Sequence, residues 1–468
     1  MNQIALGVFF LILAGIAAGG FYVPYNGVKK WSWEVYWITG GIMSWIIAPW
    51  VMAFVLTKDP VHAIAATWQV DKAAVIAAYL FGMMWGVGGL SYGLAIRYLG
   101  MSLGMAVANG FCTVIGTLMP LFLKGEFTSK ILATDAGRIN LFGLIACALG
   151  IALAGAAGMS KEKEMSDEAK KQSVKEFSFV KGMIVATIAG VFSAGMAFAI
   201  DKAAPVAFSS EHFGTEVLWT GLPKLCVILL GGFTTNFIWC LYLLAKNKTF
   251  YEFTGKYQKA DLAAQGVEAS DTAIAKAESE GRLKGLRIPI LANIFFSMLA
   301  GLLWYMQFFF YTMGETKMGS FKFSCWTLHM AFAFVFSSFF GLALHEWRGS
   351  SKFTKSLLMM ALATLIYSTF LVGYSNFMNA DAVNVTTKVV AAEAEDGTSV
   401  STLVTERVLT SEQAAKTGES IKAAEEEKAS LAEKEASVKA LLDELYPQNS
   451  PNGTPPEENS GEPIGQTE

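Results

Sequence analysis

Long apolar segments recur along the whole chain, and they limit its possible folds more than any other feature. Each segment is long enough to cross the roughly 30 Å hydrocarbon core of a bilayer as a helix. None carries Asp or Glu deep in its middle. Since a span in lipid must close its own backbone hydrogen bonds, we predict an all-α membrane protein with ten transmembrane helices. The ten segments are residues 4–23, 34–56, 73–96, 102–123, 138–158, 181–200, 218–244, 288–312, 323–344 and 356–377.

The composition excludes several classes of soluble protein. Hydrophobic residues make up 53% of the 468 residues and charged residues only 16%, too few to cover a soluble surface of this size. The chain has no Walker loop and no dinucleotide-binding fingerprint, and its five cysteines lie inside the spans without a CxxC pair. We therefore expect no enzyme, no cofactor, no metal site and no nucleic-acid partner. The expected surroundings are the lipid bilayer.

The distribution of Lys and Arg predicts how the chain is oriented. The odd-numbered loops hold about 20 of these residues and the even-numbered loops about 8, which places the odd loops in the cytoplasm. The first loop, in "FYVPYNGVKKWSWE", combines Lys29 and Lys30 with Trp31 and Trp33, a typical membrane-interface anchor. On this count the N-terminus lies outside, and 246–287 is a large cytoplasmic loop.

Four regions follow from the pattern: a first five-helix unit (1–158), a cytoplasmic linker (159–180), a second five-helix unit with its long loop (181–378), and a hydrophilic tail (379–468). The tail holds 18 acidic and 7 basic residues. Residues 420–445 suggest an amphipathic helix, and the Pro-, Gly- and Glu-rich end is typical of disorder. We expect an acidic tail that is partly helical or disordered.

The two five-helix units resemble each other in sequence. "AGIAAGGFYVPYN" (14–26) aligns with "AGVFSAGMAFAID" (189–201), and "GMMWGVGGLSYGLAIRYLG" (82–100) aligns with "GLLWYMQFFFYTMGETKMG" (301–319). The alignments place the first span on the sixth and the third on the eighth, as duplication of a five-helix unit predicts. Because five is odd, the copies would be inverted in the membrane, an arrangement typical of secondary transporters with alternating access and a site near the midplane.

Several stretches carry a family resemblance: "FYVPYNGVKKWSWE", "GGIMSWIIAPW", "FGMMWGVGGLSYGLAIRYLGMSLGMA", "FSAGMAFA", "LLWYMQFFFYTMGETKMG", "WTLHMAF" and "HEW". Over residues 1 to about 375 the chain resembles the L-rhamnose–proton symporter family of the drug/metabolite transporter superfamily. The resemblance implies ten helices in the bacterial inner membrane and uptake of L-rhamnose, or a closely related sugar, by proton symport. The acidic tail and the 246–287 loop are larger than the family implies. Many superfamily members keep both termini in the cytoplasm, unlike the orientation predicted from charge.

A neutral sugar needs aromatic platforms and a few hydrogen-bonding side chains in an apolar pocket. The third and eighth spans offer a Trp and a Tyr seven residues apart, and therefore on one face of each helix. Polar side chains in the fourth and eighth spans add hydrogen-bonding groups, although such residues also bond helices to one another. The predicted sugar-binding residues are Trp85, Tyr92, Asn109, Trp304, Gln307 and Tyr311.

Proton coupling needs a titratable group within reach of the site. His329 lies well inside the ninth span, and imidazole titrates near physiological pH, although a neutral buried histidine has the same sequence pattern. Glu34, at the first turn of the second span, and Asp201, beside Lys202, are the next candidates. Lys224 is expected to extend its amine to the membrane interface.

Two other functions remain open from the residues alone. An exporter of amphipathic metabolites would use the same scaffold with a more hydrophobic cavity. A membrane sensor would act through the acidic tail without transport, although inverted halves serve no purpose in a sensor.

Overall fold

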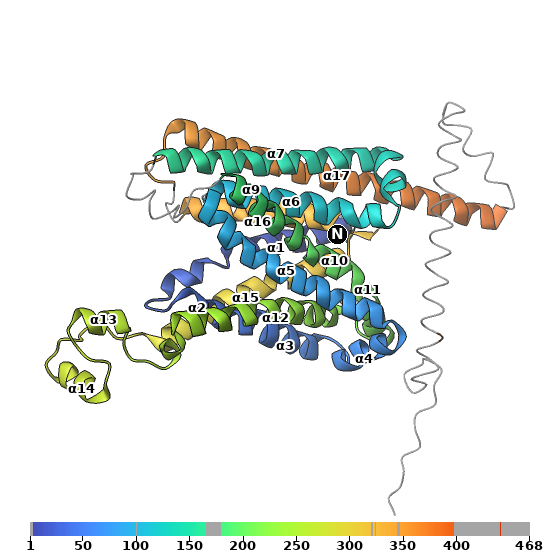
Figure 1. Ribbon diagram of the computed structural model, residues 1–468. Coiled ribbons are helices and arrows are strands. Elements are labelled where there is room, and N and C mark those ends of the chain that lie inside the picture. The colour runs from blue at the N-terminus through green and yellow to red at the C-terminus, as the bar shows by residue number, and fades with distance from the viewer. Residues whose placement is uncertain are drawn as a thin grey trace, which may run out of the picture.

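A computed structural model describes residues 3–99, 101–164, 179–319, 322, 324–343, 347–396 and 440 (Figure 1). In this part the chain is helical, apart from turns, connections and one isolated β-bridge. Nine helical segments of the described residues are long and apolar enough to cross a membrane, and each coincides with a predicted span. The predicted span 102–123 coincides with helix α6, whose apolar stretch is shorter. The nine segments are Gln3–Gly27, Trp33–Leu56, Lys72–Tyr92, Asp135–Lys161, Val180–His212, Val217–Asn247, Ile290–Glu315, Ser324–Ala343 and Lys352–Ser375.

The second span is a continuous helical rod with a widened turn in its middle. Pro49 has no N–H to bond the carbonyl of Trp45, four residues earlier. The N–H of Ala48 instead bonds the carbonyl of Met43, five residues back, so the helix widens into a π-turn before Pro49.

The first half comprises α1 (Gln3–Gly20), η1 (Val23–Gly27), α2 (Trp33–Ile42), η2 (Met43–Ile47), α3 (Ala48–Leu56), α4 (Pro60–Val70), α5 (Lys72–Leu99), α6 (Met101–Leu123), η3 (Thr128–Leu132) and α7 (Asp135–Glu164).

The second half is more broken than the sequence predicts. The sixth span is interrupted at Ala194 and again at Ala203. The last helix runs on past residue 377 to Asp396, while the predicted tail helix over 420–445 lies outside the described residues except for Ala440. The elements are α9 (Phe179–Ser193), α10 (Gly195–Lys202), α11 (Ala204–His212), η4 (Val217–Trp219), α12 (Gly221–Asn247), η5 (Phe250–Phe253), α13 (Lys259–Ala264), α14 (Asp271–Ser279), α15 (Ile290–Glu315), α16 (Ser324–Ala343) and α17 (Lys352–Asp396).

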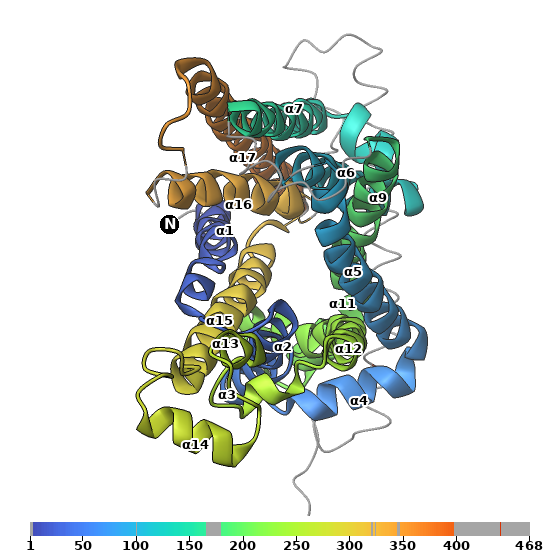
Figure 2. The same ribbon diagram turned by 60° about the vertical axis from the view of Figure 1, so that its left-hand side comes forward.

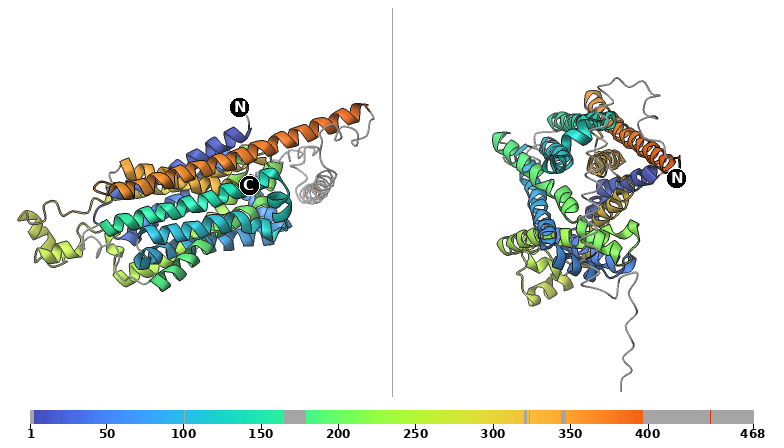
Figure 3. Two further views of the ribbon diagram at one scale, coloured as in Figure 1. Left: turned by 90° about the horizontal axis from the view of Figure 1, so that it is seen from above. Right: turned by 90° about the vertical axis from the view of Figure 1, so that its right-hand side faces the viewer.

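The first predicted span packs on two late spans, and the sixth predicted span packs on two early ones. Helix α1 packs on α15 and α16, and α9 packs on α5 and α6. Helix α2 lies between α12 and α15 (Figure 2) and contacts both. Helices α7 and α17 lie side by side along one edge of the bundle (Figures 1 and 3), where Ser368 Oγ donates to the carbonyl of Gly143.

Glycines allow these helices to touch through their backbones. A Cβ added at any of four glycines would lie 2.1 to 2.4 Å from an atom of the neighbouring helix, well inside van der Waals contact. Larger residues at these crossings would push the helices apart. The contacts are Gly15 against Phe332 of α16, Gly190 against Ala108 of α6, Gly82 against Ile228 of α12, and Gly301 against Gly40 of α2.

The bundle has two dissimilar ends. One end, which we call the loop end, carries residues 246–287 (left in Figure 1), and these form a small folded unit rather than an extended loop. Its own apolar core includes Tyr257, Leu262, Val267, Ala277 and Leu283. The opposite end, which we call the far end, carries α4 and the close of α6 and α15.

Candidate functional site

Three tryptophans meet at the centre of the bundle. The ring centroids of Trp85 (α5) and Trp304 (α15) are 5.2 Å apart, and Trp45 (η2) stands edge-on to Trp304 at 5.6 Å. Trp45 also stands edge-on to Trp85 at 6.3 Å. The structure therefore brings together Trp85 and Trp304, the two predicted platforms. Trp45 was missed by the sequence reasoning because its position depends on the π-turn before Pro49. We call these three residues the tryptophan cluster.

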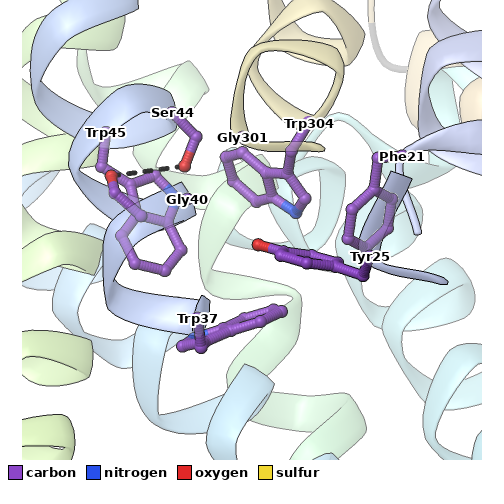
Figure 4. Close-up of a pocket in the computed structure, with 9 residues that line it drawn as sticks. Phe21, Tyr25, Trp37, Gly40, Ser44, Trp45, Gly301 and Trp304 are labelled. Atoms are coloured by element: carbon purple, nitrogen blue, oxygen red, sulfur yellow. Dashed lines mark hydrogen bonds between the residues drawn. The ribbon is translucent and has the colours of Figure 1, made fainter. Parts of the chain in front are cut away.

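A narrow pocket with about 10 Å³ of free volume, about the room of one water molecule, lies beside the tryptophan cluster (Figure 4). The Tyr25 ring lies between Trp37 and Trp304, and its hydroxyl occupies the space over Gly40, where a Cβ would lie 2.3 Å away. The Trp37 indole N–H donates to Asn236 Oδ1 on α12. The lining residues are Phe21, Tyr25, Trp37, Gly40, Gly41, Ser44, Trp45, Gly301 and Trp304.

The pocket combines apolar ring faces with a few polar groups that have capacity to spare. The Trp45 indole N–H is buried and has no hydrogen-bond partner among the described residues. Buried donors are usually paired, so an unpaired one beside a pocket suits a ligand that accepts hydrogen bonds. Aromatic faces with a small number of donors and acceptors fit the C–H faces and hydroxyls of a monosaccharide.

Of the remaining predicted sugar residues, Gln307 bonds a residue of the tryptophan cluster, whereas Tyr92, Asn109 and Tyr311 contact other residues. Gln307 is buried, and its amide donates to the backbone carbonyl of Trp304 at 2.9 Å. The Tyr92 hydroxyl donates to Asn109 Oδ1, which joins α5 to α6. Tyr311 is buried about two helical turns beyond Trp304 and faces His329.

His329 lies in a cage of aromatic rings. Its ring centroid is 5.5 Å from that of Tyr311, 5.9 Å from Trp326 and 6.0 Å from Phe308. Phe308 also contacts Trp304 at 5.1 Å, so it connects the histidine to the tryptophan cluster. The His329 Nδ1 atom is buried without a hydrogen-bond partner among the described residues. A charged imidazole here would rest on aromatic faces alone.

The two predicted carboxylates have different surroundings. Glu34 is buried at the loop end, where Oε1 accepts hydrogen bonds from Asn247 Nδ2 (2.9 Å) and Thr249 Oγ1 (2.8 Å). Asp201 lies at the far end and pairs with Lys124 at the end of α6, not with its neighbour Lys202. Glu34 is thus tied by neutral donors, and Asp201 by a cation.

An ion pair at the far end was missed by the sequence reasoning. Lys224 Nζ on α12 lies 2.6 Å from Glu315 Oε2 on α15, and the lysine side chain is only 5% exposed. The expectation that Lys224 reaches the interface is wrong, because the amine has a carboxylate partner inside the bundle. Its signal in the sequence was a lysine within one apolar span and a glutamate at the end of another.

Metal-binding residues do not gather in the part of the chain that the structure describes: no three His, Cys, Asp or Glu side chains there are close enough to hold an ion.

Membrane-length helices around a small aromatic pocket, with titratable groups buried beside it, define a multi-pass membrane transporter. The chain matches the model of the family described as L-rhamnose-proton symport protein (RhaT) over residues 1–261 and 282–378, and it belongs to that family. The L-rhamnose-proton symporters of Yersinia pestis (strain Pestoides F) and Yersinia pseudotuberculosis (serotype O:1b, strain IP 31758) are each 36% identical to it over 378 residues. That stretch is 80% of this chain and 98% of each relative.

These findings confirm the predicted family and the prediction of a transporter rather than an enzyme. The relatives are bacterial, and a multi-pass transporter of such a cell lies in the inner membrane, as predicted. Residues 262–281, within the folded 246–287 unit, and the chain after 378 lie outside the family match.

Proposed function

We propose that this chain takes up L-rhamnose, or a closely related sugar, together with a proton, by alternating access between two inverted five-helix halves. The family match over nearly all of residues 1–378 supports the sugar and the proton. In this proposal α6 also crosses the membrane, as the fourth of ten spans. The loop end faces the cytoplasm, as the Lys and Arg counts predict, and the far end faces the outside.

The glycine crossings are the observation that carries the proposed mechanism. A duplication would pair the first span with the sixth and the fourth with the ninth. The Gly15 contact between α1 and α16 then corresponds to the Gly190 contact between α9 and α6. In the same way, the Gly82 contact with α12 corresponds to the Gly301 contact with α2. Both pairs of glycines also align in the sequence repeat. Matching crossings in two halves are what inverted repeats require, and such repeats rock around a central site.

In this proposal the sugar binds at the tryptophan cluster. Trp85 and Trp304 supply ring faces. Gln307 donates its amide N–H to the Trp304 carbonyl, and its amide oxygen accepts a hydrogen bond from the sugar. The sugar's path continues on the side of Phe308 away from Trp304, where it is lined by Tyr92, Asn109 and Tyr311. His329 carries the coupled proton, with the aromatic cage around it as support for the imidazolium, and Glu34 and Asp201 are the alternative proton sites.

Binding to the purified protein tests the proposed sugar site. Trp304→Ala and Trp85→Ala are expected to weaken L-rhamnose binding by about tenfold or more, the usual cost of a buried aromatic anchor. Trp239→Ala serves as the matched control, because Trp239 is 41% exposed on the surface of α12. Unchanged affinity in both cluster variants would remove the cluster from the sugar site.

Transport by reconstituted vesicles tests the direction and the coupling. Labelled L-rhamnose is expected to accumulate only when the outside is more acidic, up to about tenfold per pH unit for one proton per sugar. Net efflux under the same gradient would favour the exporter instead.

A further inference from the structure

We propose that the Lys224–Glu315 ion pair is the gate at the far end, and that a proton taken up by Glu315 from that side opens it. This inference rests on the proposed alternating-access function and names a residue group that controls one side of it.

The pair joins α12 and α15, which meet at the far end and are separated by another span at the loop end. At the loop end α2 and η2 lie between α12 and α15 and contact both. At the far end the two helices meet directly, because a Cβ at Gly221 would lie 2.7 Å from Thr312 Cβ. Lys224 lies one turn from Gly221 toward the centre of the bundle, and Glu315 lies one turn from Thr312 toward the far end. Their side chains meet in an ion pair that is the polar part of the joint.

The joint lies directly over the sugar site. Glu315 follows Trp304 by eleven residues on α15, about 16 Å along the helix at 1.5 Å per residue. Lys224 precedes Gly232, which contacts the Trp85 ring, by eight residues on α12, or about 12 Å. Separation of α12 from α15 at the pair would therefore open a path from the far end toward the tryptophan cluster.

The carboxylate of Glu315 is the group of the pair that can accept a proton, because the Lys224 ammonium has no lone pair. Glu315 is also the more exposed of the two side chains, at 16% against 5%. Protonation removes the charge that holds Lys224, and a buried lysine without its partner favours a conformation in which water reaches it. A deprotonated Glu315 re-forms the pair and closes the joint.

The elements packed around the pair differ in the ionisable groups that they carry. The described residues of α1 carry none. Lys224, Lys322 and Glu315 are the charged side chains near Cys325. Asp201 and Glu315 are the charged side chains near Tyr311. Lys317 follows α15 and contacts α1 at Gly7. Of these groups, only Lys224 forms an ion pair with Glu315 in the described residues.

The distance between spin labels across the joint tests the gate. Labels at Val217→Cys and Thr316→Cys, in a background without the five native cysteines, report the separation of η4 from the end of α15 in reconstituted wild-type protein. At pH 7.5 we expect one short distance, with an open form below about 10%. At pH 5.5 the fraction of protein with the longer distance should be higher than at pH 7.5.

Glu315→Gln mimics the protonated carboxyl and is expected to show the longer distance at both pH values. Glu126→Gln is the matched control, since Glu126 pairs with Lys130 at the same end but within a single turn, and it should behave as wild type. If Glu315→Gln fails to fold, the double variant Lys224→Met/Glu315→Gln removes both charges and is expected to be open at both pH values.

A folded Glu315→Gln or double variant that keeps the short distance would overturn the gate, and so would a wild-type distance that ignores pH. The spin-label distances are measured without sugar. Failure of the proposed function would appear separately, as wild-type vesicles that take up no L-rhamnose under an acid-outside gradient.

Discussion

The loop end and the far end of the bundle are held together by different chemistry. At the loop end Trp31 donates to the carbonyl of Glu252, Ser32 N–H donates to Glu252 Oε2, and Glu34 accepts from neutral Asn247 and Thr249. At the far end two ion pairs cross between helices, Lys224–Glu315 and Lys124–Asp201. The loop end has an ion pair as well, Lys30–Asp261, which joins the first loop to the 246–287 unit and is partly exposed. The loop end thus relies mainly on hydrogen bonds from neutral donors, whereas the far end has a buried ion pair between two spans.

The largest effect that sharpens this comparison is expected at the buried far-end pair. Lys224→Ala leaves Glu315 without its cation and should lower the free energy of unfolding by about 3–5 kcal/mol, the usual cost of breaking a buried pair from one side. Lys124→Ala breaks the more exposed pair and should cost about 0–1 kcal/mol. Thermal unfolding in detergent at pH 7.5 measures both variants. Equal shifts in melting temperature would mean that burial does not distinguish the two pairs.

A middle-sized effect is expected at the glycine crossings, where the halves should behave alike. Gly82→Ala and Gly301→Ala each place a Cβ 2.1 to 2.2 Å from a carbonyl oxygen of the next helix, and overpacking of this kind costs about 1–3 kcal/mol. Gly89→Ala on α5 meets nothing within 4 Å and serves as the control. Damage at one crossing without damage at the other, measured by thermal unfolding, would argue against equivalent halves.

A small effect is expected at the loop-end carboxylate Glu164. Hydrogen bonds from the side chains of Ser351 and Thr354 lower the pKa of Glu164, so its contribution to stability is present above the ordinary glutamate pKa and is lost as the pH falls through the lowered value. Glu164→Gln should therefore change the melting temperature slightly at pH 7.5 and should leave the pH dependence between 5.5 and 7.5 as in wild type. A variant that flattens this range would show that the loop end also senses pH.

Sequence reasoning anticipates the spans because each one is a local property: a bilayer-length apolar run has few alternatives to a helix. Trp85 and Trp304, both predicted as sugar-binding residues, lie in contact at the centre of the bundle. The tail helix lies outside the described residues, and the roles of the predicted site residues remain predictions.

The misses have a common physical cause, which is that they depend on contacts between distant parts of the chain. Lys224 and Glu315 are 91 residues apart, and only the packing of α12 on α15 shows that they pair. Trp45 enters the cluster because Pro49 forces a π-turn. The 246–287 unit folds around Tyr257, Leu262 and Leu283, whose spacing shows no simple helical period.

Proton movement driven by the sugar tests the central claim of coupled uptake most directly. Right-side-out vesicles containing the protein are suspended in weakly buffered medium without energy sources, and the external pH is recorded while L-rhamnose is added. Coupled entry predicts a prompt alkalinisation of the medium that depends on the protein and disappears when an ionophore makes the membrane permeable to protons. It should also be lost in Trp304→Ala vesicles. Entry of labelled L-rhamnose through the wild-type protein with no change in external pH would contradict proton symport.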